Sequence, residues 1–182
     1  WGEQGIGDQI MFASLLPKLQ QRVQRILVET RQRLVSLFDR SFAGICFFPI
    51  QDPPDASLLD ESIDYQSPIG SLTQWLLPDE ESFPQNKSYL KACAHKTAQL
   101  RDKYQRLASG KILIGISWMS VNKHIGKPKS TSLTQWKDLL SQKDCVFINL
   151  QYGDVKSEID AFYEQTGISI YHDQEINSLD SL

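Results

Sequence analysis

Apolar residues along the first fifty positions change their spacing repeatedly, and each change predicts a new element. From Ile10 to Leu19 they recur at helical spacing, although Pro17 should kink this helix or end it early. Two short β-branched or aromatic runs then flank a second amphipathic stretch: RILVET at 25–30, RQRLVSLFDRS at 31–41 and GICFFPI at 44–50. This order predicts parallel strands joined by crossover helices.

Prolines and acidic residues interrupt that pattern between residues 51 and 87. The composition predicts a loop-rich segment with a strand at 63–65 and a short helix at 71–77, for which Ser71 is the candidate N-cap. A charged amphipathic stretch over 88–109 predicts a longer helix. Gly110 is well placed to end it.

The α/β pattern then restarts. KILIGISWMS predicts a strand buried on both faces, and a polar, lysine-bearing loop follows it. The remaining segments predict helix, strand, helix and strand in turn: LTQWKDLLSQ, DCVFINLQYG, DVKSEIDAFYEQTG and ISIYHD. We therefore expect two α/β domains, residues 1–109 and residues 110–182, with the second one incomplete.

Composition narrows the class of protein. With 19 basic and 22 acidic residues, the chain carries a formal net charge of −3, which argues against a general nucleic-acid binder. The three cysteines, Cys46, Cys93 and Cys145, are widely spaced and form no C-x-x-C pair, so buried free thiols are expected. No membrane-spanning run or secretory signal is visible, which favours a soluble, cytoplasmic protein. Residue 1 is Trp, and we expect the chain to be excised from a longer one.

The first candidate site is Gly5-Ile6-Gly7-Asp8, directly before a predicted helix. Gly5 and Gly7 leave space beside the backbone, and a helix N-terminus offers N–H groups to an anion. A carboxylate at Asp8 could serve there as a general base. The alternative is a tight turn in which Asp8 only caps its own helix. The dinucleotide-binding motif G-x-G-x-x-G is incomplete here, because its third glycine would stand at position 10, which is Ile.

The second candidate site is the loop that follows the 111–120 strand. Ligands bind outside the carboxyl ends of strands in open α/β sheets, and lysines and hydroxyls suit a diphosphate. The alternative is a solvated basic loop. The histidines at 95, 124 and 172 are scattered and predict surface or capping roles, not a metal site. The polar residues of the loop are Ser117, Ser120, Asn122, Lys123, Lys127, Lys129, Ser130 and Thr131.

Several segments together resemble the glycosyltransferase-like domain attached to tetratricopeptide-repeat proteins in bacteria, which is related to the ADP-heptose:lipopolysaccharide heptosyltransferase family. The matching segments are WGEQGIGDQIMFASLLPKL, ILVETRQRLVSLFDRSF, IDYQSPIGSLTQWL, KILIGISWMSVNKHIGKPKSTSLTQWKDLL and VFINLQYG. They occur in the family's order and cover nearly the whole chain.

This resemblance implies two Rossmann-like domains of a GT-B-type glycosyltransferase fold. The C-terminal domain would bind a nucleotide-diphosphate sugar, and the N-terminal domain would bind a glycan or protein acceptor. Asp8 matches the catalytic base, and Lys129 matches the residue that contacts donor phosphate. Ser117 and Ser120 match positions near that phosphate, with Lys123 and Ser130 beside them. Gly5, Gly7 and Ser71 belong to the acceptor-side loops.

The departures from the family pattern bear on activity. The family's first strand and its D-T-x-x-x-H-L-A-type segment are absent from the sequence, so we expect the fragment alone to be inactive. No D-x-D motif occurs, and a metal-independent reaction without a cofactor is expected. Tetratricopeptide repeats would precede Trp1 in the parent chain, and exposed sheet edges are compatible with a homodimer. The alternative function is a non-catalytic carbohydrate- or protein-binding α/β module that uses Tyr65, Trp75, Trp118 and Trp136.

Overall fold

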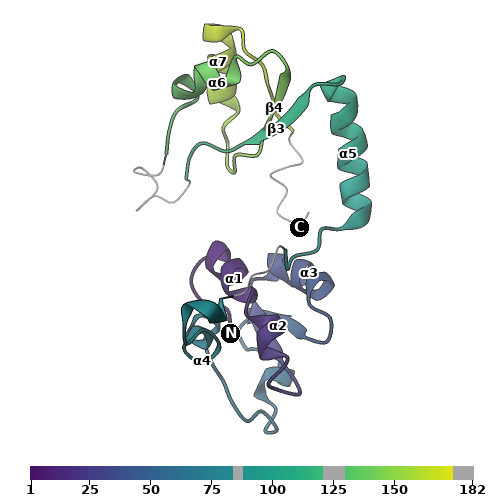
Figure 1. Ribbon diagram of the computed structural model, residues 1–182, viewed down its shortest axis with the longest axis vertical. Coiled ribbons are helices and arrows are strands. Elements are labelled where there is room, and N and C mark those ends of the chain that lie inside the picture. Colours follow the sequence, from purple (N-terminus) through teal and green to yellow (C-terminus); the bar gives the residue numbers. More distant parts are fainter. Residues whose placement is uncertain (84–87, 121–129, 174–182) are drawn as a thin grey trace. The chain divides into compact units, whose positions relative to one another are not determined.

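The computed structural model describes residues 1–83, 88–120 and 130–173 (Figure 1). It is a mixed α/β structure with two parallel sheets. Its described residues divide into two compact units, unit 1 at 1–94 and unit 2 at 95–173. The division falls before the long charged helix, whereas the sequence pattern predicts it after that helix.

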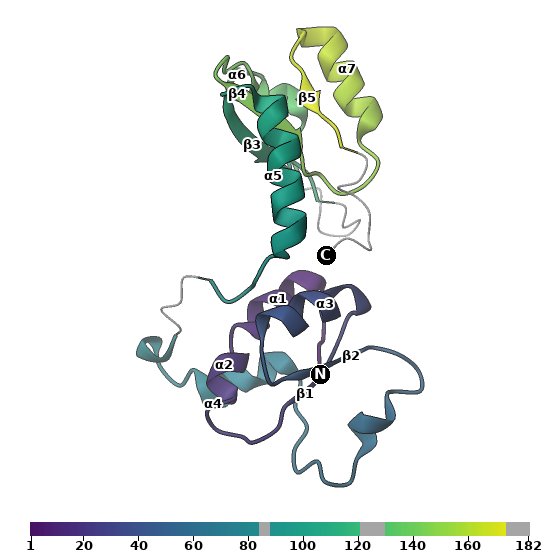
Figure 2. The same ribbon diagram turned by 90° about the vertical axis from the view of Figure 1, so that its right-hand side faces the viewer.

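Unit 1 contains a two-stranded parallel sheet, in which Leu27 pairs with Cys46 and Thr30 pairs with Pro49. Helices α1 and α3 lie over one face of this sheet (Figure 2). The elements are α1 (Ile6–Ala13), α2 (Leu16–Leu19), β1 (Leu27–Thr30), α3 (Gln32–Ser41) and β2 (Cys46–Pro49). Pro17 ends the first helix early, as predicted: α1 stops at Ala13, and the proline sits in the first turn of α2, where no N–H is needed.

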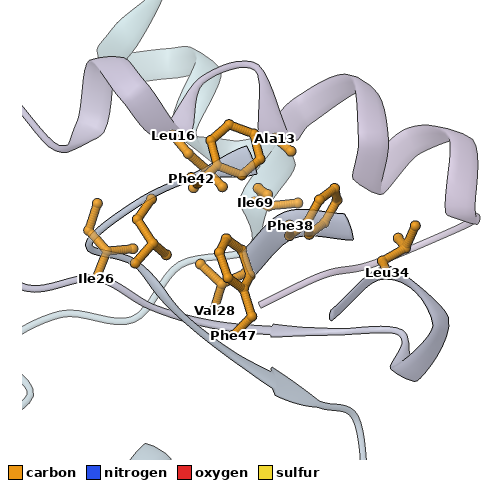
Figure 3. Close-up of a cluster of buried hydrophobic side chains, with 10 residues drawn as sticks. Ala13, Leu16, Ile26, Val28, Leu34, Phe38, Phe42, Phe47 and Ile69 are labelled. Atoms are coloured by element: carbon orange, nitrogen blue, oxygen red, sulfur yellow. The ribbon is translucent and has the colours of Figure 1, made fainter. Parts of the chain in front are cut away.

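The core of unit 1 fills the space between the helices and the sheet (Figure 3). Phe38, Phe42 and Phe47 meet there with ring centroids 5.4–6.0 Å apart. Ala13, Leu16, Ile26, Val28, Leu34, Ile45 and Ile69 complete the cluster. Side chains alternate along a strand, so Phe47 faces this core while its neighbour Cys46 faces the other side. Cys46 is exposed, and the prediction of a buried thiol was wrong at this position.

Short helical turns make up the rest of unit 1: η1 (Ala56–Leu59), η2 (Ile69–Leu72), α4 (Thr73–Leu76) and η3 (Glu80–Ser82). The helix expected at 71–77 therefore forms, but Ser71 is not its N-cap. Pro68, with φ −57°, starts the helical path two residues earlier, and η2 runs directly into α4. The strand expected at 63–65 does not form, and Tyr65 is 91% exposed.

Unit 2 is a three-stranded parallel sheet of order β3-β4-β5. The strands are β3 (Ile112–Ile116), β4 (Cys145–Asn149) and β5 (Ile170–Tyr171). Helical elements precede or connect them: α5 (Ala94–Ala108), η5 (Leu133–Trp136), α6 (Lys137–Leu140) and α7 (Lys156–Thr166). Gly110 and Gly167, the predicted helix stops, have φ of +86° and +70°, which glycine adopts without strain.

Helices cover both faces of the unit 2 sheet, with α5 on one side and α6 and α7 on the other (Figure 1). Ile170 packs into the core formed with α6 and α7. The next residue, Tyr171, faces the opposite way, and its ring lies 6.1 Å from that of Tyr104 on α5. The 111–120 run was predicted to be a strand buried on both faces, and this was wrong for most of β3, in which only Ile116 is buried and Ile112 is 63% exposed. The reason is the place of β3 at an edge of the described sheet, where one side of the strand has no neighbour.

The long helix begins later than its sequence pattern predicts. The expected span was 88–109, but α5 starts at Ala94. Tyr89 and Leu90 instead pack against the unit 1 core, and the Tyr89 hydroxyl donates to the Ile10 carbonyl at 2.8 Å. The backbone N–H of Lys91 donates to Ser41 Oγ at 2.9 Å. These tertiary contacts hold the segment extended. None of the described helices combines the length and the apolar character that a bilayer crossing requires.

Candidate functional site

The Gly5–Asp8 loop lies at the carboxyl end of β1. Gly2 N–H donates to the Glu29 carbonyl at 2.6 Å, which ties the start of the chain to that strand. Gln4 takes the left-handed conformation with φ +60°, and Gly5 is extended with φ −84°. A Cβ added to Gly7 would meet no atom within 4 Å. The packing of the chain therefore does not require glycine at position 7, and the backbone there is open on one side.

Asp8 is the third residue of α1 and is half-buried. Its Oδ2 accepts a hydrogen bond from the Gly5 N–H at 3.0 Å, which is the capping interaction that the alternative interpretation predicts. No described residue donates to Oδ1. The carboxylate thus has one oxygen held within its own turn and one oxygen available to an external donor.

Ser71 lies on η2, which packs against α1. The neighbouring Gly70 is tightly placed, since a Cβ there would lie 2.8 Å from Glu3 Oε1 and 3.2 Å from the Phe12 ring. Ile69 N–H also donates to the Trp1 carbonyl at 2.9 Å. The structure therefore brings the acceptor-side segments at Gly5 and Ser71 to one end of unit 1.

Gln9, which the sequence analysis did not single out, anchors this end of the sheet. It is only 1% exposed. Its Oε1 accepts from Thr30 Oγ1 at 2.7 Å and from the Arg31 N–H at 3.2 Å. These donors fix the orientation of the amide, because a flipped amide would set its NH₂ group against the Arg31 N–H. Gln9 Nε2 is buried and has no hydrogen-bond partner among the described residues.

The second candidate site lies at the carboxyl edge of the unit 2 sheet, where buried Gln151 organises the backbone. Its Oε1 accepts from Ser117 Oγ at 3.0 Å, from Trp118 N–H at 3.0 Å and from Met119 N–H at 2.9 Å. Its Nε2 donates to the Tyr152 carbonyl at 2.9 Å. Ser117 is therefore where the sequence predicts it, but its hydroxyl proton is directed at Gln151.

Hydrogen bonds close the base of the polar loop. Ser120 N–H donates to Ser130 Oγ at 3.0 Å, and Thr131 N–H donates to the Trp118 carbonyl at 2.9 Å. We call these four residues the neck. Ser120 and Ser130 thus lie together, as expected for one site. Lys123 and Lys129 lie outside the described residues, so their phosphate-binding role stays a prediction.

The tryptophans differ in their exposure. Trp118 is 3% exposed, packs in the unit 2 core, and donates its indole N–H to Glu158 at 3.1 and 3.2 Å. It is a structural residue and does not offer a stacking surface. Trp136 is half-buried and donates to Thr131 Oγ1 at 2.8 Å. Trp75 remains 57% exposed in unit 1.

Two further polar clusters at the edge of unit 2 were missed in the sequence. Asn149, which is fully buried, accepts from the Gln151 N–H at 2.8 Å and contacts His172 Nδ1 at 2.8 Å. Asp173 Oδ2 lies 2.8 Å from the Tyr104 hydroxyl and 2.7 Å from Lys103 Nζ. Burial, and then the hydrogen bond to Asp173, raise the pKa of Tyr104 above its usual value. The signal that could have found both clusters is a polar residue directly after a buried strand.

Within the described ranges, no three His, Cys, Asp or Glu side chains gather as a metal site. No family model matches the chain, and no solved structure matches it. The chain is similar to Protein FlbA of Caulobacter vibrioides, with 27% identity over an alignment that covers 96% of this chain. It spans only 31% of the length of FlbA.

Proposed function

We propose that the intact protein is a glycosyltransferase that moves a sugar from a nucleotide-diphosphate sugar to an acceptor hydroxyl. The observation that carries the proposal is the edge of unit 2, where hydroxyls at Ser117, Ser130 and Thr131 gather beyond a parallel sheet. Such edges are the usual ligand sites of α/β sheets. The resemblance to the heptosyltransferase-related domain supports the same assignment, with unit 2 on the donor side of a GT-B-type fold.

Asp8 is the base of the proposed reaction. The acceptor hydroxyl oxygen attacks the anomeric carbon and gives its proton to the Asp8 carboxylate, while the bond from that carbon to the diphosphate oxygen breaks. The nucleoside diphosphate leaves with the electron pair. Lys129 and Lys123, with the hydroxyls of Ser120 and Ser130, would stabilise its charge. Ser117 would support the site indirectly, because its single hydroxyl proton is donated to Gln151. The open backbone at Gly7 gives the acceptor room beside the base.

The test is transfer by the intact protein, assayed with nucleotide-diphosphate sugars of the common bases. Asp8→Asn should lower turnover by about 10²–10⁴-fold, because general base catalysis contributes that much, and should leave donor affinity nearly unchanged. Asp39→Asn, an exposed change on α3, is the matched control. Full turnover in the Asp8→Asn protein would remove Asp8 from the mechanism.

Donor binding is tested separately by calorimetry. Lys129→Ala should weaken nucleoside diphosphate binding about tenfold or more, since a charge-assisted hydrogen bond to phosphate is lost. The exposed Lys143 of the same unit provides the control variant Lys143→Ala. Unchanged affinity in Lys129→Ala would contradict the donor-side assignment.

A second candidate function is a carbohydrate- or protein-binding module without catalysis. It is favoured by two aromatic side chains of unit 1, Trp75 at 57% and Tyr65 at 91% exposure. Exposed aromatic faces stack on sugars and anchor protein partners. Under this function, Trp75→Ala would abolish glycan or partner binding, and no sugar transfer would be detected with any donor.

A further inference from the structure

The carboxyl ends of all three strands of unit 2 are linked by one chain of hydrogen bonds. Ser117 follows β3, Asn149 ends β4, and His172 follows β5. Gln151 joins Ser117 to Asn149, because its side chain accepts from the first and its backbone N–H donates to the second. Asn149 in turn meets His172. This chain of bonds ends at the imidazole of His172, which is half-buried.

The polarity of the last hydrogen bond follows from the first ones. Asn149 Oδ1 accepts from the Gln151 N–H at 2.8 Å, so its Nδ2 is the atom that faces His172 Nδ1, also at 2.8 Å. An amide nitrogen can only donate, and Nδ1 must therefore accept. A neutral imidazole that accepts at Nδ1 carries its proton on Nε2. No described residue is bonded to Nε2.

This polarity selects the kind of ligand. A histidine that binds a metal through Nε2 usually donates its Nδ1–H to an oxygen, which is the reverse of the arrangement at His172. A proton on Nε2 instead suits an acceptor oxygen, such as those of a phosphate or a ribose. Asn149 therefore does more than connect two strands, because its Nδ2 also defines the tautomer of the half-buried His172.

We propose that His172 is a donor-binding residue whose Nε2–H donates to an oxygen of the nucleoside diphosphate, and that Asn149 is the positioning residue that keeps the proton on Nε2. This inference rests on the proposed function, and it assigns to the donor site a side chain from the third strand. The ligand would then contact unit 2 beyond β3, where the sequence predicts the site, and beyond β5 as well.

The sharpest test is Asn149→Asp in the intact protein. The new carboxylate has almost the same shape and still accepts from the Gln151 N–H, but it must now accept from His172 as well. At about pH 9, where an imidazole is neutral, the proton should move to Nδ1 and leave a lone pair on Nε2. Nitrogen-15 NMR of the imidazole reports the tautomer directly. Affinity for the nucleoside diphosphate that binds the wild type, chosen from ADP, UDP, GDP and CDP, should fall about tenfold or more.

Two variants at His172 guard against a folding failure of the Asn149 variant. His172→Phe removes the donor and should weaken binding about tenfold, whereas His172→Gln keeps an N–H donor and should stay within about threefold of wild type. His95→Phe, an exposed change on α5, should have no effect. A switched tautomer with unchanged affinity, or a wild-type proton on Nδ1, would overturn the inference. If none of the four diphosphates binds the wild type, the proposed function fails and this inference fails with it. If a diphosphate binds but its affinity does not depend on the tautomer, only this inference fails.

Discussion

The two units use the same device at the end of their first strand and complete it to different degrees. In unit 1 the amide oxygen of Gln9 receives the Thr30 hydroxyl and the next N–H along the chain. In unit 2 the amide oxygen of Gln151 receives the Ser117 hydroxyl and the next two N–H groups. Each glutamine is 1% exposed. A buried glutamine thus shapes the turn that leaves each sheet edge.

The two units differ in what the side-chain NH₂ group of this glutamine contacts. Gln151 Nε2 donates to the Tyr152 carbonyl, whereas Gln9 Nε2 is buried without a partner. An unsatisfied buried donor costs about 1–3 kcal/mol. The glutamine at the unit 2 edge therefore has a partner for both ends of its amide, while the unit 1 edge retains a local energetic cost beside its candidate catalytic loop. The three substitutions below test this contrast.

The largest effect is expected for Gln151→Met. This change leaves one buried and one part-buried N–H group and a hydroxyl without their shared acceptor, and should lower the stability of unit 2 by about 3 kcal/mol. Hydrogen exchange of the β3 and β4 amides measures the loss. Gln142→Met, an exposed change in the same unit, is the control and should be neutral. Equal exchange rates in wild type and Gln151→Met would mean that the network does not stabilise the edge.

Gln9→Met should lower the stability of unit 1 by a smaller amount, about 1 kcal/mol. The Thr30 hydroxyl and the Arg31 N–H lose their acceptor, but the unpaired Nε2 and its cost disappear with the same substitution. Exchange of the β1 and β2 amides reports this loss, with the exposed Gln32→Met as control. A loss as large as that of Gln151→Met would indicate that Nε2 is satisfied in solution, and the contrast between the units would disappear.

Gly7→Ala should have the smallest effect on stability, and it should raise the stability instead of lowering it. No atom lies within 4 Å of the added Cβ, so the gain in helix propensity should stabilise α1 by up to about 1 kcal/mol. Gly115→Ala, on β3 of unit 2, would set a Cβ against Leu150 Cδ1, so the exposed Leu150 side chain must turn aside and no gain in stability is expected. Thermal unfolding of both variants tests the pair. In the proposed enzyme, Gly7→Ala should also weaken acceptor binding, since it fills the open space.

Most of the regular elements could be predicted from the sequence. Apolar runs such as KILIGIS predict parallel strands, although β3 is less buried than its run suggests because it lies at an edge of the described sheet. Gly110 and Gly167 lie at helix ends because they adopt positive φ. Elements that depend on distant partners could not be predicted. The strand at 63–65 has no neighbouring strand to pair with, and α5 begins late because Tyr89 is bonded to α1.

The candidate sites follow the same rule. The positions of Asp8, Ser117 and Ser130 at the ends of elements could be predicted because each lies in a polar segment next to a predicted strand or helix, and their roles stay predictions. The role of Gln151 could not be predicted, because its partners directly follow another strand, 32–34 positions earlier. His172 was assigned a surface or capping role, but its bond to Asn149 depends on β4 and β5 being neighbours in the sheet. Strand order was not part of the prediction.

The neck has a consequence for how this region can vary. The chain leaves the sheet at Trp118 and Ser120 and returns at Ser130 and Thr131, and two hydrogen bonds join the outgoing residues to the returning ones. Doubling the length of a loop on such a closed base costs only about 0.6 kcal/mol in closure entropy. A base closed in this way accepts loops of different length, which makes Ser120 and Ser130 the graft points to choose for altering ligand preference.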